Sequence, residues 1–247
     1  MEIYDINVKV YTLQNISKED SIQSLSKLID QSFYKNENMK DFHTENKIKG
    51  YCFNSLYPLA LDNKVYQKGN IYNFQIRCIQ SKLKDHFVNF LCNEYTSKLK
   101  VLVCRSKKIN KKPIEKIYSI TPLIIKISDE YKTQYWRNNH SESDFFEYIR
   151  NSSIKKYEVL TGEKLDKNLQ LFNYERIDTK KPISTKFKNK NILGDKVTLR
   201  IDTNQKAQDI AYMVIGTGLC DISSRGYGFV NYQYVKWKET MIFDKWN

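Results

Sequence analysis

Cysteine pairs at metal-ligand spacing and long hydrophobic runs are both missing from this sequence. The five cysteines are scattered, and no two of them form a CxxC pair. We therefore expect neither a zinc site nor a disulfide framework, and a reducing cytoplasmic location is favoured. No apolar run approaches the roughly 18–20 residues that span a bilayer. The acidic start Met1–Asp5 is also unlike a signal peptide, so we expect no membrane contact.

Glycine is scarce as well, with eight in 247 residues. Because glycine weakens helices and strands, so few of them should mark places where a side chain is not tolerated. Residues 216–230, called the glycine-rich turn below, hold two Gly-x-Gly pairs: Gly216, Gly218, Gly226 and Gly228. Ser223, Ser224 and Arg225 lie between the pairs. The pattern favours close approach of the backbone to a phosphate or an anionic polymer, and it also fits a tight helix-to-strand connection without a ligand.

Positive charge is in clear excess, with 41 Lys and Arg against 28 Asp and Glu and a formal net charge of +13. Such an excess indicates a polyanionic partner, either a nucleic acid or an acidic membrane surface. No basic amphipathic helix stands out, so nucleic acid is favoured. The run 105–113 is densely basic and includes Lys107, Lys108, Lys111 and Lys112. It reads equally well as a solvated linker and as a contact to an RNA backbone.

The first half predicts the order strand, helix, strand, strand, helix, strand. Ser17 followed by Asp20 is typical of a capped helix start, and Ile6, Val8 and Val10 alternate as in a strand. The predicted elements are strand 2–13, a helix from Ser17 to about Tyr34, strands 51–56 and 71–79, a helix over 83–91 and strand 99–104.

The second half repeats this order more loosely. The predicted elements are strand 117–127, a helix from about 143 to 154, strands 169–177 and 196–201 around the basic segment 180–190, a helix over 205–215 capped by Asp202 or Thr203, and strand 227–235. Two such units predict an α+β protein of tandem ferredoxin-like (βαββαβ) domains, residues 1–112 and 113–247, with a cleft between them.

These features carry a resemblance to a known family. The glycine-rich turn lies between a last helix and a last strand, as in the RAMP superfamily of CRISPR-associated proteins. The whole chain most closely resembles the CRISPR repeat-cleaving endoribonucleases, the sixth Cas family. Further matching features are the N-terminal strand, the His43 stretch leading into Tyr51–Leu56, and the strand Ser119–Leu123.

The resemblance implies cleavage of precursor CRISPR RNA without a metal or cofactor. The RNA 2′-OH attacks the adjacent phosphorus, which leaves a 5′-hydroxyl and a 2′,3′-cyclic phosphate. Enzymes of this family commonly use a histidine after the first helix, often with a tyrosine and a lysine. His43 matches the histidine, Lys47 or Lys49 the lysine, and Tyr34 or Tyr51 the tyrosine. Their chemistry suits the task, since a histidine transfers protons near neutral pH and a lysine offsets charge on the phosphorane.

The glycine-rich turn would then hold the RNA. Its glycines would expose backbone N–H groups to phosphates, Ser223 and Ser224 would donate hydrogen bonds, and Arg225 would pair with a phosphate or read a guanine edge. Tyr227 and Phe229 suit either base stacking or core packing.

The other candidates are weaker. His86 lies within a predicted helix and reads as a packing or surface residue, and His140 in its loop is kept as a reserve proton-transfer group. Asp41 and Glu45 beside His43 are the only suggestive carboxylates, which argues against a metal-dependent nuclease.

Two alternatives to the enzyme stay open. One is a non-catalytic RNA-binding RAMP subunit of a CRISPR effector complex, in contact with other Cas proteins. The other is a nucleic-acid-binding protein unrelated to CRISPR. Either a monomer or a homodimer is compatible with the sequence.

Overall fold

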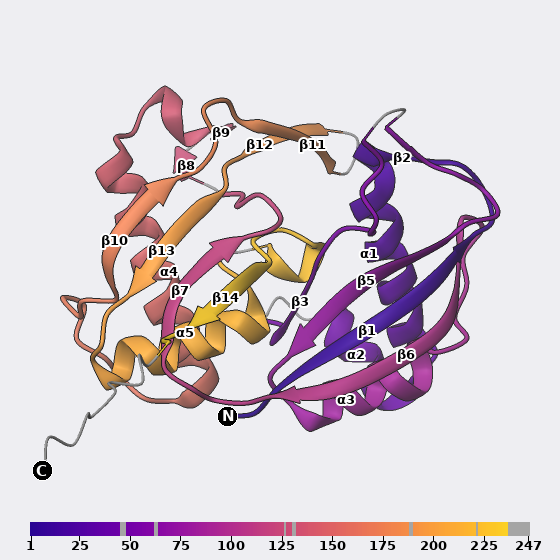
Figure 1. Cartoon of the computed structure of the whole chain (residues 1–247), viewed down its shortest axis with the longest axis horizontal. Helices are drawn as coiled ribbons and strands as arrows, with labels where there is room; N and C mark the ends of the chain where they lie inside the picture. The colour runs from indigo at the N-terminus through magenta and orange to yellow at the C-terminus, as the bar shows by residue number, and fades with distance from the viewer. Residues whose placement is uncertain are drawn as a thin grey trace, which may run out of the picture.

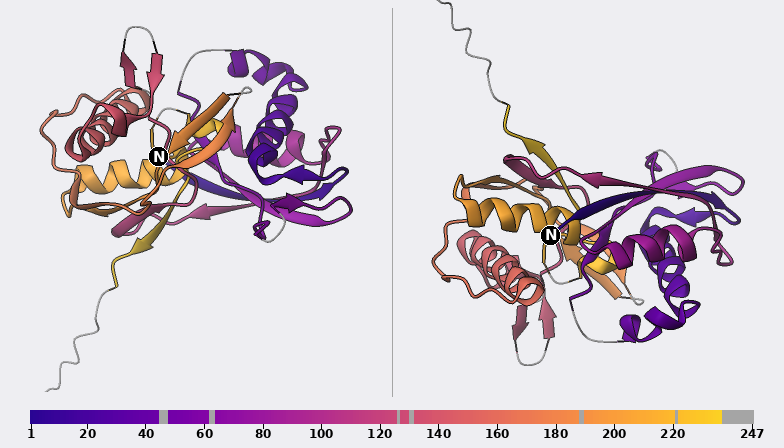
Figure 2. Two further views of the ribbon diagram at one scale, coloured as in Figure 1. Left: turned by 90° about the horizontal axis from the view of Figure 1, so that it is seen from above. Right: turned by 90° about the horizontal axis from the view of Figure 1, so that it is seen from below.

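The computed structural model describes residues 1–44, 48–61, 64–125, 127–129, 132–187, 190–220 and 222–236. Two four-stranded antiparallel sheets, each with helices on one side, lie next to each other (Figures 1 and 2). Each sheet belongs to one βαββαβ unit, so the predicted tandem ferredoxin-like fold is confirmed. The boundary at residues 112 and 113 stays a prediction.

The first sheet has the strand order β3-β5-β1-β6. Its strands are β1 (Ile3–Thr12), β3 (Tyr51–Phe53), β5 (Ile71–Cys78) and β6 (Leu99–Ile109). The accompanying segments are α1 (Lys18–Tyr34), η1 (Glu37–Met39), α2 (Lys40–Thr44), α3 (Ser81–His86) and the π-helix η2 (Phe87–Leu91), with the short pair β2 (Ile16–Ser17) and β4 (Val65–Tyr66).

Helix α1 forms where the sequence predicts it. The Ser17 hydroxyl accepts a hydrogen bond from the Asp20 N–H at 3.1 Å, a cap that typically contributes about 1 kcal/mol. The apolar positions at helical spacing, from Ile22 to Phe33, are buried against the alternating face of β1 that carries Ile6 and Val8. The first core therefore follows directly from the two periodicities in the sequence.

The second sheet has the order β10-β13-β7-β14. Its strands are β7 (Ile114–Ser119), β10 (Phe172–Ile177), β13 (Val197–Ile201) and β14 (Val230–Tyr234). The helices are α4 (Glu142–Thr161) and α5 (Gln205–Thr217), with the short segments η3 (Trp136–Asn138) and η4 (Ser223–Arg225) and the hairpins β8 (Ile127–Asp129)–β9 (Lys132–Gln134) and β11 (Ile183–Phe187)–β12 (Lys190–Gly194).

Several predicted boundaries were wrong. Residues 105–109 belong to β6 and pair with β1, because the lysines of this run lie on a strand whose hydrogen bonds are made by its backbone. The predicted helix over 83–91 changes from α to π geometry at Phe87. Much of the basic segment 180–190 forms the hairpin β11–β12, which reaches across to α1 (Figure 1). Helix α5 is capped by Asn204 and not by Asp202 or Thr203.

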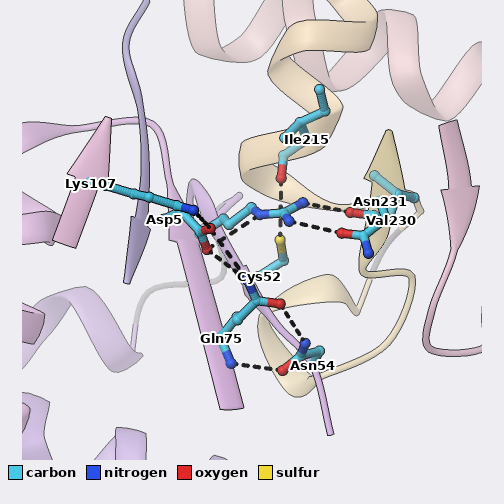
Figure 3. Close-up of polar contacts among 9 residues, drawn as sticks. Asp5, Cys52, Asn54, Gln75, Lys107, Ile215, Val230 and Asn231 are labelled. Atoms are coloured by element: carbon cyan, nitrogen blue, oxygen red, sulfur yellow. Dashed lines mark hydrogen bonds and ion pairs between the residues drawn. The ribbon is translucent and has the colours of Figure 1, made fainter. Parts of the chain in front are cut away.

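The two units share a packed interface, in which Gly216 of α5 lies against Ile3 and Ile79. The buried Arg77 of β5 crosses this interface to β14, whose residues Val230 and Asn231 are labelled in Figure 3. Its guanidinium donates to the Val230 carbonyl at 2.6 Å and to the Asn231 side chain at 2.9 Å, and it lies 4.5 Å from the Phe229 ring centroid. Helix α5 and Arg77 fill the interface where the sheets meet. An open cleft elsewhere between the units stays a prediction.

Candidate functional site

The glycine-rich turn docks onto the first unit. It leaves α5 after Thr217, passes through η4 and enters β14. Gly226 has φ +91°, and a Cβ at this position would lie 2.7 Å from both Ile22 and Phe53. Glycine is required here because both the backbone conformation and the space exclude a side chain.

Three glycine N–H groups of the turn are bonded within the protein, which corrects one expectation. Gly218, Gly226 and Gly228 donate to Val214, Ser223 and Pro122 carbonyls at 2.7, 3.1 and 2.9 Å. Gly216 is part of α5. The prediction that these glycines offer N–H groups to phosphates was wrong for Gly218, Gly226 and Gly228, because the turn uses those groups to hold its own shape.

A buried lysine that the sequence analysis missed forms hydrogen bonds with the backbone of the turn. Lys156 of α4 is 6% exposed and donates to the carbonyls of Gly218 and Cys220 at 2.8 and 2.9 Å. Its ammonium also lies 3.4 Å from the Ser223 hydroxyl. The available signal was its position on the apolar face of α4, seven residues after Ile149.

Arg225 connects the turn to α1. Its guanidinium forms an ion pair with Asp30 at 2.6 Å and donates to the Ser26 hydroxyl at 3.0 Å. Ser224 is half-buried beside it, whereas Ser223 is buried. Arg225 therefore fixes the turn on α1, and contact of Ser224 or Arg225 with RNA stays a prediction.

The two aromatic residues of the turn belong to the core. Tyr227 and Phe229 are 1% and 0% exposed. The Tyr227 hydroxyl lies 3.2 Å from the Thr185 hydroxyl of β11, and so it joins the turn to the hairpin. Of the two interpretations of these rings, core packing is confirmed.

His43 lies in α2, the short helix that follows α1 and η1. Helix α2 packs on α1 through Phe42, whose ring centroid is 5.3 Å from that of Phe33. The side chain of His43 lies outside the described part of the structure. The position after the first helix agrees with the residue named from the sequence, and its catalytic role stays a prediction.

Lys49 is tied to the same helix. Its ammonium donates to the carbonyl of Phe42 and lies 5.0 Å from the centre of the Phe42 ring. A cation is thereby held next to the backbone of His43. Lys47 lies outside the described residues.

The two candidate tyrosines differ in exposure. Tyr34 ends α1 and is 52% exposed. Tyr51 is 3% exposed, packs against Phe33 and Phe87, and has its pKa raised by burial. Of this pair, Tyr34 is the one that presents its side chain to solvent.

Helix α1 thus brings together two segments from opposite ends of the chain. Its residues Ser26 and Asp30 hold the glycine-rich turn, and Phe33 holds the helix that carries His43.

The basic run lies elsewhere. Lys107 and Lys108 pair with Asp5 and Glu2, Lys111 pairs with Asp209 at 2.6 Å, and Lys112 lies over the Tyr234 ring.

His86 has the packing role expected from the sequence: it is 2% exposed and stacks on Phe33. His140 follows η3, where its backbone N–H donates to the Trp136 carbonyl. In the described ranges, no three His, Cys, Asp or Glu side chains gather into a group able to hold a metal ion. Nor does any helix of those ranges have the length and apolarity to span a bilayer.

Fold and site define a tandem ferredoxin-like protein whose second unit closes with a glycine-rich turn docked on the first. Residues 104–232 match the family model described as CRISPR associated protein Cas6, C-terminal. Because this match covers more than half of the chain, the chain belongs to the Cas6 family. The resemblance stated from the sequence is confirmed.

Solved structures agree at the level of the fold. A structure described as CRISPR associated protein Cas6 aligns with a TM-score of 0.64 and 20% identity, covering 94% of this chain and 100% of its own. A Cas6-related protein from Pyrococcus furiosus gives 0.69 and 16%, covering 94% and 98%. A Thermus thermophilus Cas6 in a product complex gives 0.63 and 11%, covering 94% and 100%. No match is found among the curated proteins.

Proposed function

We propose that this protein is an endoribonuclease that binds CRISPR repeat RNA and cleaves it in precursor transcripts without a metal ion. Membership of the Cas6 family supports the substrate class. Two structures similar in fold point the same way: one is described as a product complex, and another as a RAMP protein binding different RNA substrates.

One observation carries the proposal most directly. Helix α1 holds both the glycine-rich turn, through Arg225 and Asp30, and α2, through Phe33 and Phe42. A strand of RNA bound along α1 would therefore meet the turn and the segment carrying His43 on the same support.

The chemistry requires few groups because RNA supplies its own nucleophile. The enzyme must align the 2′-OH, the phosphorus and the leaving 5′-oxygen, and must move two protons. In our proposal His43 acts as general base or general acid, a contribution of roughly 10²–10⁴-fold. The ammonium of Lys49, held at the Phe42 carbonyl, offsets negative charge on the phosphorane. Tyr34, exposed at the end of α1, is the preferred tyrosine helper.

RNA binding in this proposal uses the basic surface rather than the glycine N–H groups. Ser224 and Arg225 contact the backbone near the cleaved bond. Lys107, Lys108, Lys111 and Lys112 are exposed and add phosphate contacts further along the RNA, because an ion pair of an exposed lysine exchanges easily for a pair with phosphate.

Incubation of labelled repeat RNA with the protein in EDTA tests the proposal. We expect one cut per repeat and a 2′,3′-cyclic phosphate on the upstream product. His43→Ala should lower the single-turnover rate by roughly 10²–10⁴-fold and leave RNA affinity within about threefold of the parent. His140→Ala tests the reserve histidine and should cleave normally if His43 is the proton-transfer group.

The outcomes separate the alternatives. A free 3′-hydroxyl would contradict attack by the 2′-OH. RNA binding without cleavage by the parent protein would instead support a non-catalytic RAMP subunit, and equal affinity for unrelated RNA would support a general nucleic-acid-binding protein.

A further inference from the structure

A hollow of about 330 Å³ opens on the first unit between η1, α3 and η2, away from the glycine-rich turn. This volume falls in the range of sites that hold small organic groups. Its wall combines an aromatic ring, side-chain amides and both signs of charge. The lining side chains used below are Asn38, Lys82, Asp85, His86, Asn89 and Phe90.

A stack of parallel rings runs from the core into this hollow. The rings of Phe33 and His86 lie 4.2 Å apart between centroids with an angle of 4° between their planes. The rings of His86 and Phe90 are 5.6 Å apart at 11°. Phe33 and His86 are buried, whereas Phe90 is 43% exposed. A large apolar ring therefore lies at the surface, parallel to two rings that fix its orientation.

Hydrogen bonds hold the middle ring of the stack in one state. The Ser32 hydroxyl donates to the Ile29 carbonyl at 2.7 Å, so its oxygen is the acceptor for the His86 Nε2–H at 3.0 Å. The His86 Nδ1 then accepts from the Asn36 amide at 3.0 Å. Burial lowers the pKa of His86 to about 4, so the ring is neutral at physiological pH. The wall of the hollow is therefore rigid and uncharged at this ring.

The backbone is unusual at the same place. Residues Phe87–Leu91 form a π-helix directly after α3. Such turns are rare, and they occur frequently at functional sites. Here the π turn leaves Asn89 and Phe90 exposed next to each other at the rim.

We propose that this hollow binds an unpaired nucleobase of the RNA, stacked on Phe90. Sequence-specific RNA recognition commonly uses bases that stack on aromatic rings and hydrogen-bond along their edges. The amides of Asn38 and Asn89 and the carboxylate of Asp85 offer donors and acceptors to such an edge. Lys82, exposed beside them, pairs with the phosphate of the same nucleotide.

The position of the hollow selects RNA as the ligand. Segment η1 forms one side of the hollow and continues directly into α2. His43 follows Met39 by four residues, a rise of about 6 Å along a helix. The nucleotide whose base is bound here would therefore be close to the cleaved phosphate along the RNA. This inference rests on the proposed function and adds to it a site that reads a base.

An abasic scan combined with substitution of Phe90 tests the site. The probe is full-length repeat RNA with a 2′-deoxy sugar at the mapped cleavage position, so that binding is measured without cleavage. Phe90→Ala should weaken binding by about 5- to 150-fold, the loss expected for one base–aromatic stack. Phe90→Trp keeps an aromatic face and should stay within threefold of the parent. Tyr95→Ala is the control, since Tyr95 is an exposed aromatic residue that does not line the hollow.

The scan supplies the decisive result. Removal of one particular base should weaken binding to the parent by the same factor as Phe90→Ala does. With that RNA, Phe90→Ala should cause no further loss of affinity. With a base removed at any other position, Phe90→Ala should still weaken binding. If the parent cleaves repeat RNA and no abasic position couples to Phe90, the base site is overturned and the proposed function stands. A parent that binds no repeat RNA overturns both. Equal losses for Phe90→Ala and Tyr95→Ala also overturn the site, because they indicate general stacking on the surface.

Discussion

At the scale of single residues, the buried ionisable groups set the positions of the candidate site. The buried ammonium of Lys156 donates hydrogen bonds to three oxygen atoms of the glycine-rich turn. His86 holds η1 through the Asn36 amide, and η1 leads into the helix of His43. Neither residue is proposed to touch the reacting atoms, yet both fix the segments that do.

Replacing Lys156 should loosen the turn. In Lys156→Met the carbonyls of Gly218 and Cys220 lose their buried donor. We expect a loss of about 2–3 kcal/mol in the free energy of unfolding, the penalty for buried unsatisfied acceptors. Urea unfolding measures this loss. Lys155→Met is the matched control, because Lys155 is exposed on the same helix and should change stability by less than about 0.5 kcal/mol. Equal stability of the two variants would contradict this role.

His86 should make stability depend on pH in a defined window. Its pKa is about 4 in the folded protein against 6.5 for the ordinary group. The unfolded chain therefore binds the proton first, and stability falls as pH drops from 6.5 towards 4. The loss should reach about 3 kcal/mol. In His86→Gln this part of the pH dependence should vanish, whereas titration of the carboxylates continues in both proteins. Parallel stability curves for the two proteins would show the assignment to be wrong.

At the scale of elements, α1 is the common support of the site. The glycine-rich turn contacts its middle and α2 contacts its end, so the separation of the two segments follows the length of one helix. The turn in its docked form depends on close packing of Gly226 against Ile22 and Phe53.

Gly226→Ala should separate the turn from α1. The added methyl group would lie 2.7 Å from carbon atoms of Ile22 and Phe53, at a φ of +91°. Strain and overpacking together should cost about 2–5 kcal/mol and should lower RNA cleavage as well. Gly162→Ala separates backbone strain from overpacking. Gly162 has φ +75°, so an alanine there is strained, but no atom lies within 4 Å of the added Cβ. It should cost only about 1–2 kcal/mol and leave cleavage unchanged. A similar cost for both variants would show that packing at Gly226 contributes nothing.

At the scale of the whole molecule, each hydrophobic core draws residues from both halves. Ile3 and Ile79 belong to the core of the second unit, whereas Ile124 and Tyr227 belong to the core of the first. Arg77 adds a polar connection at the same interface. The two ferredoxin-like units therefore share apolar and polar packing, and we expect them to unfold together.

Separate halves should not fold normally. Residues 1–112 alone would expose the apolar surface that Tyr227 and Ile124 cover, and residues 113–247 would lose Ile3 and Ile79. We expect either fragment to bind a hydrophobic dye and to lack a cooperative urea transition, and the full chain to unfold in one step. An independent, cooperative transition in residues 1–112 would contradict this expectation.

The sequence predicted those parts of the fold that depend on local patterns. The cap at Ser17 and the alternation in β1 are local, and both are where expected. The hairpin β11–β12 was missed because lysines are frequent in it and obscure its alternation. Residues 105–109 were interpreted as part of either a solvated linker or an RNA contact, and not as a strand, because exposed strand positions tolerate charge as readily as loops do.

The site was predictable in its parts but not in its assembly. Glycine spacing located the turn, and the family resemblance pointed to His43 after the first helix, whose catalytic role stays a prediction. The contact of Arg225 with Asp30 joins residues 195 apart, and no local pattern encodes such a pair. Lys156 was overlooked because lysine is almost never fully buried without partners, and its partners are backbone carbonyls of a distant loop.

The separation of Arg225 and Asp30 also affects the synthesis of the protein. A ribosome adds about 5–20 residues per second, so α1 exists for roughly 10–40 s before the turn that covers it has been made. During that time Ile22 and Phe53 lack their contact with Gly226. The amount of active protein obtained in a cell should therefore depend on translation speed between α1 and the glycine-rich turn, as well as on the stability of the finished fold.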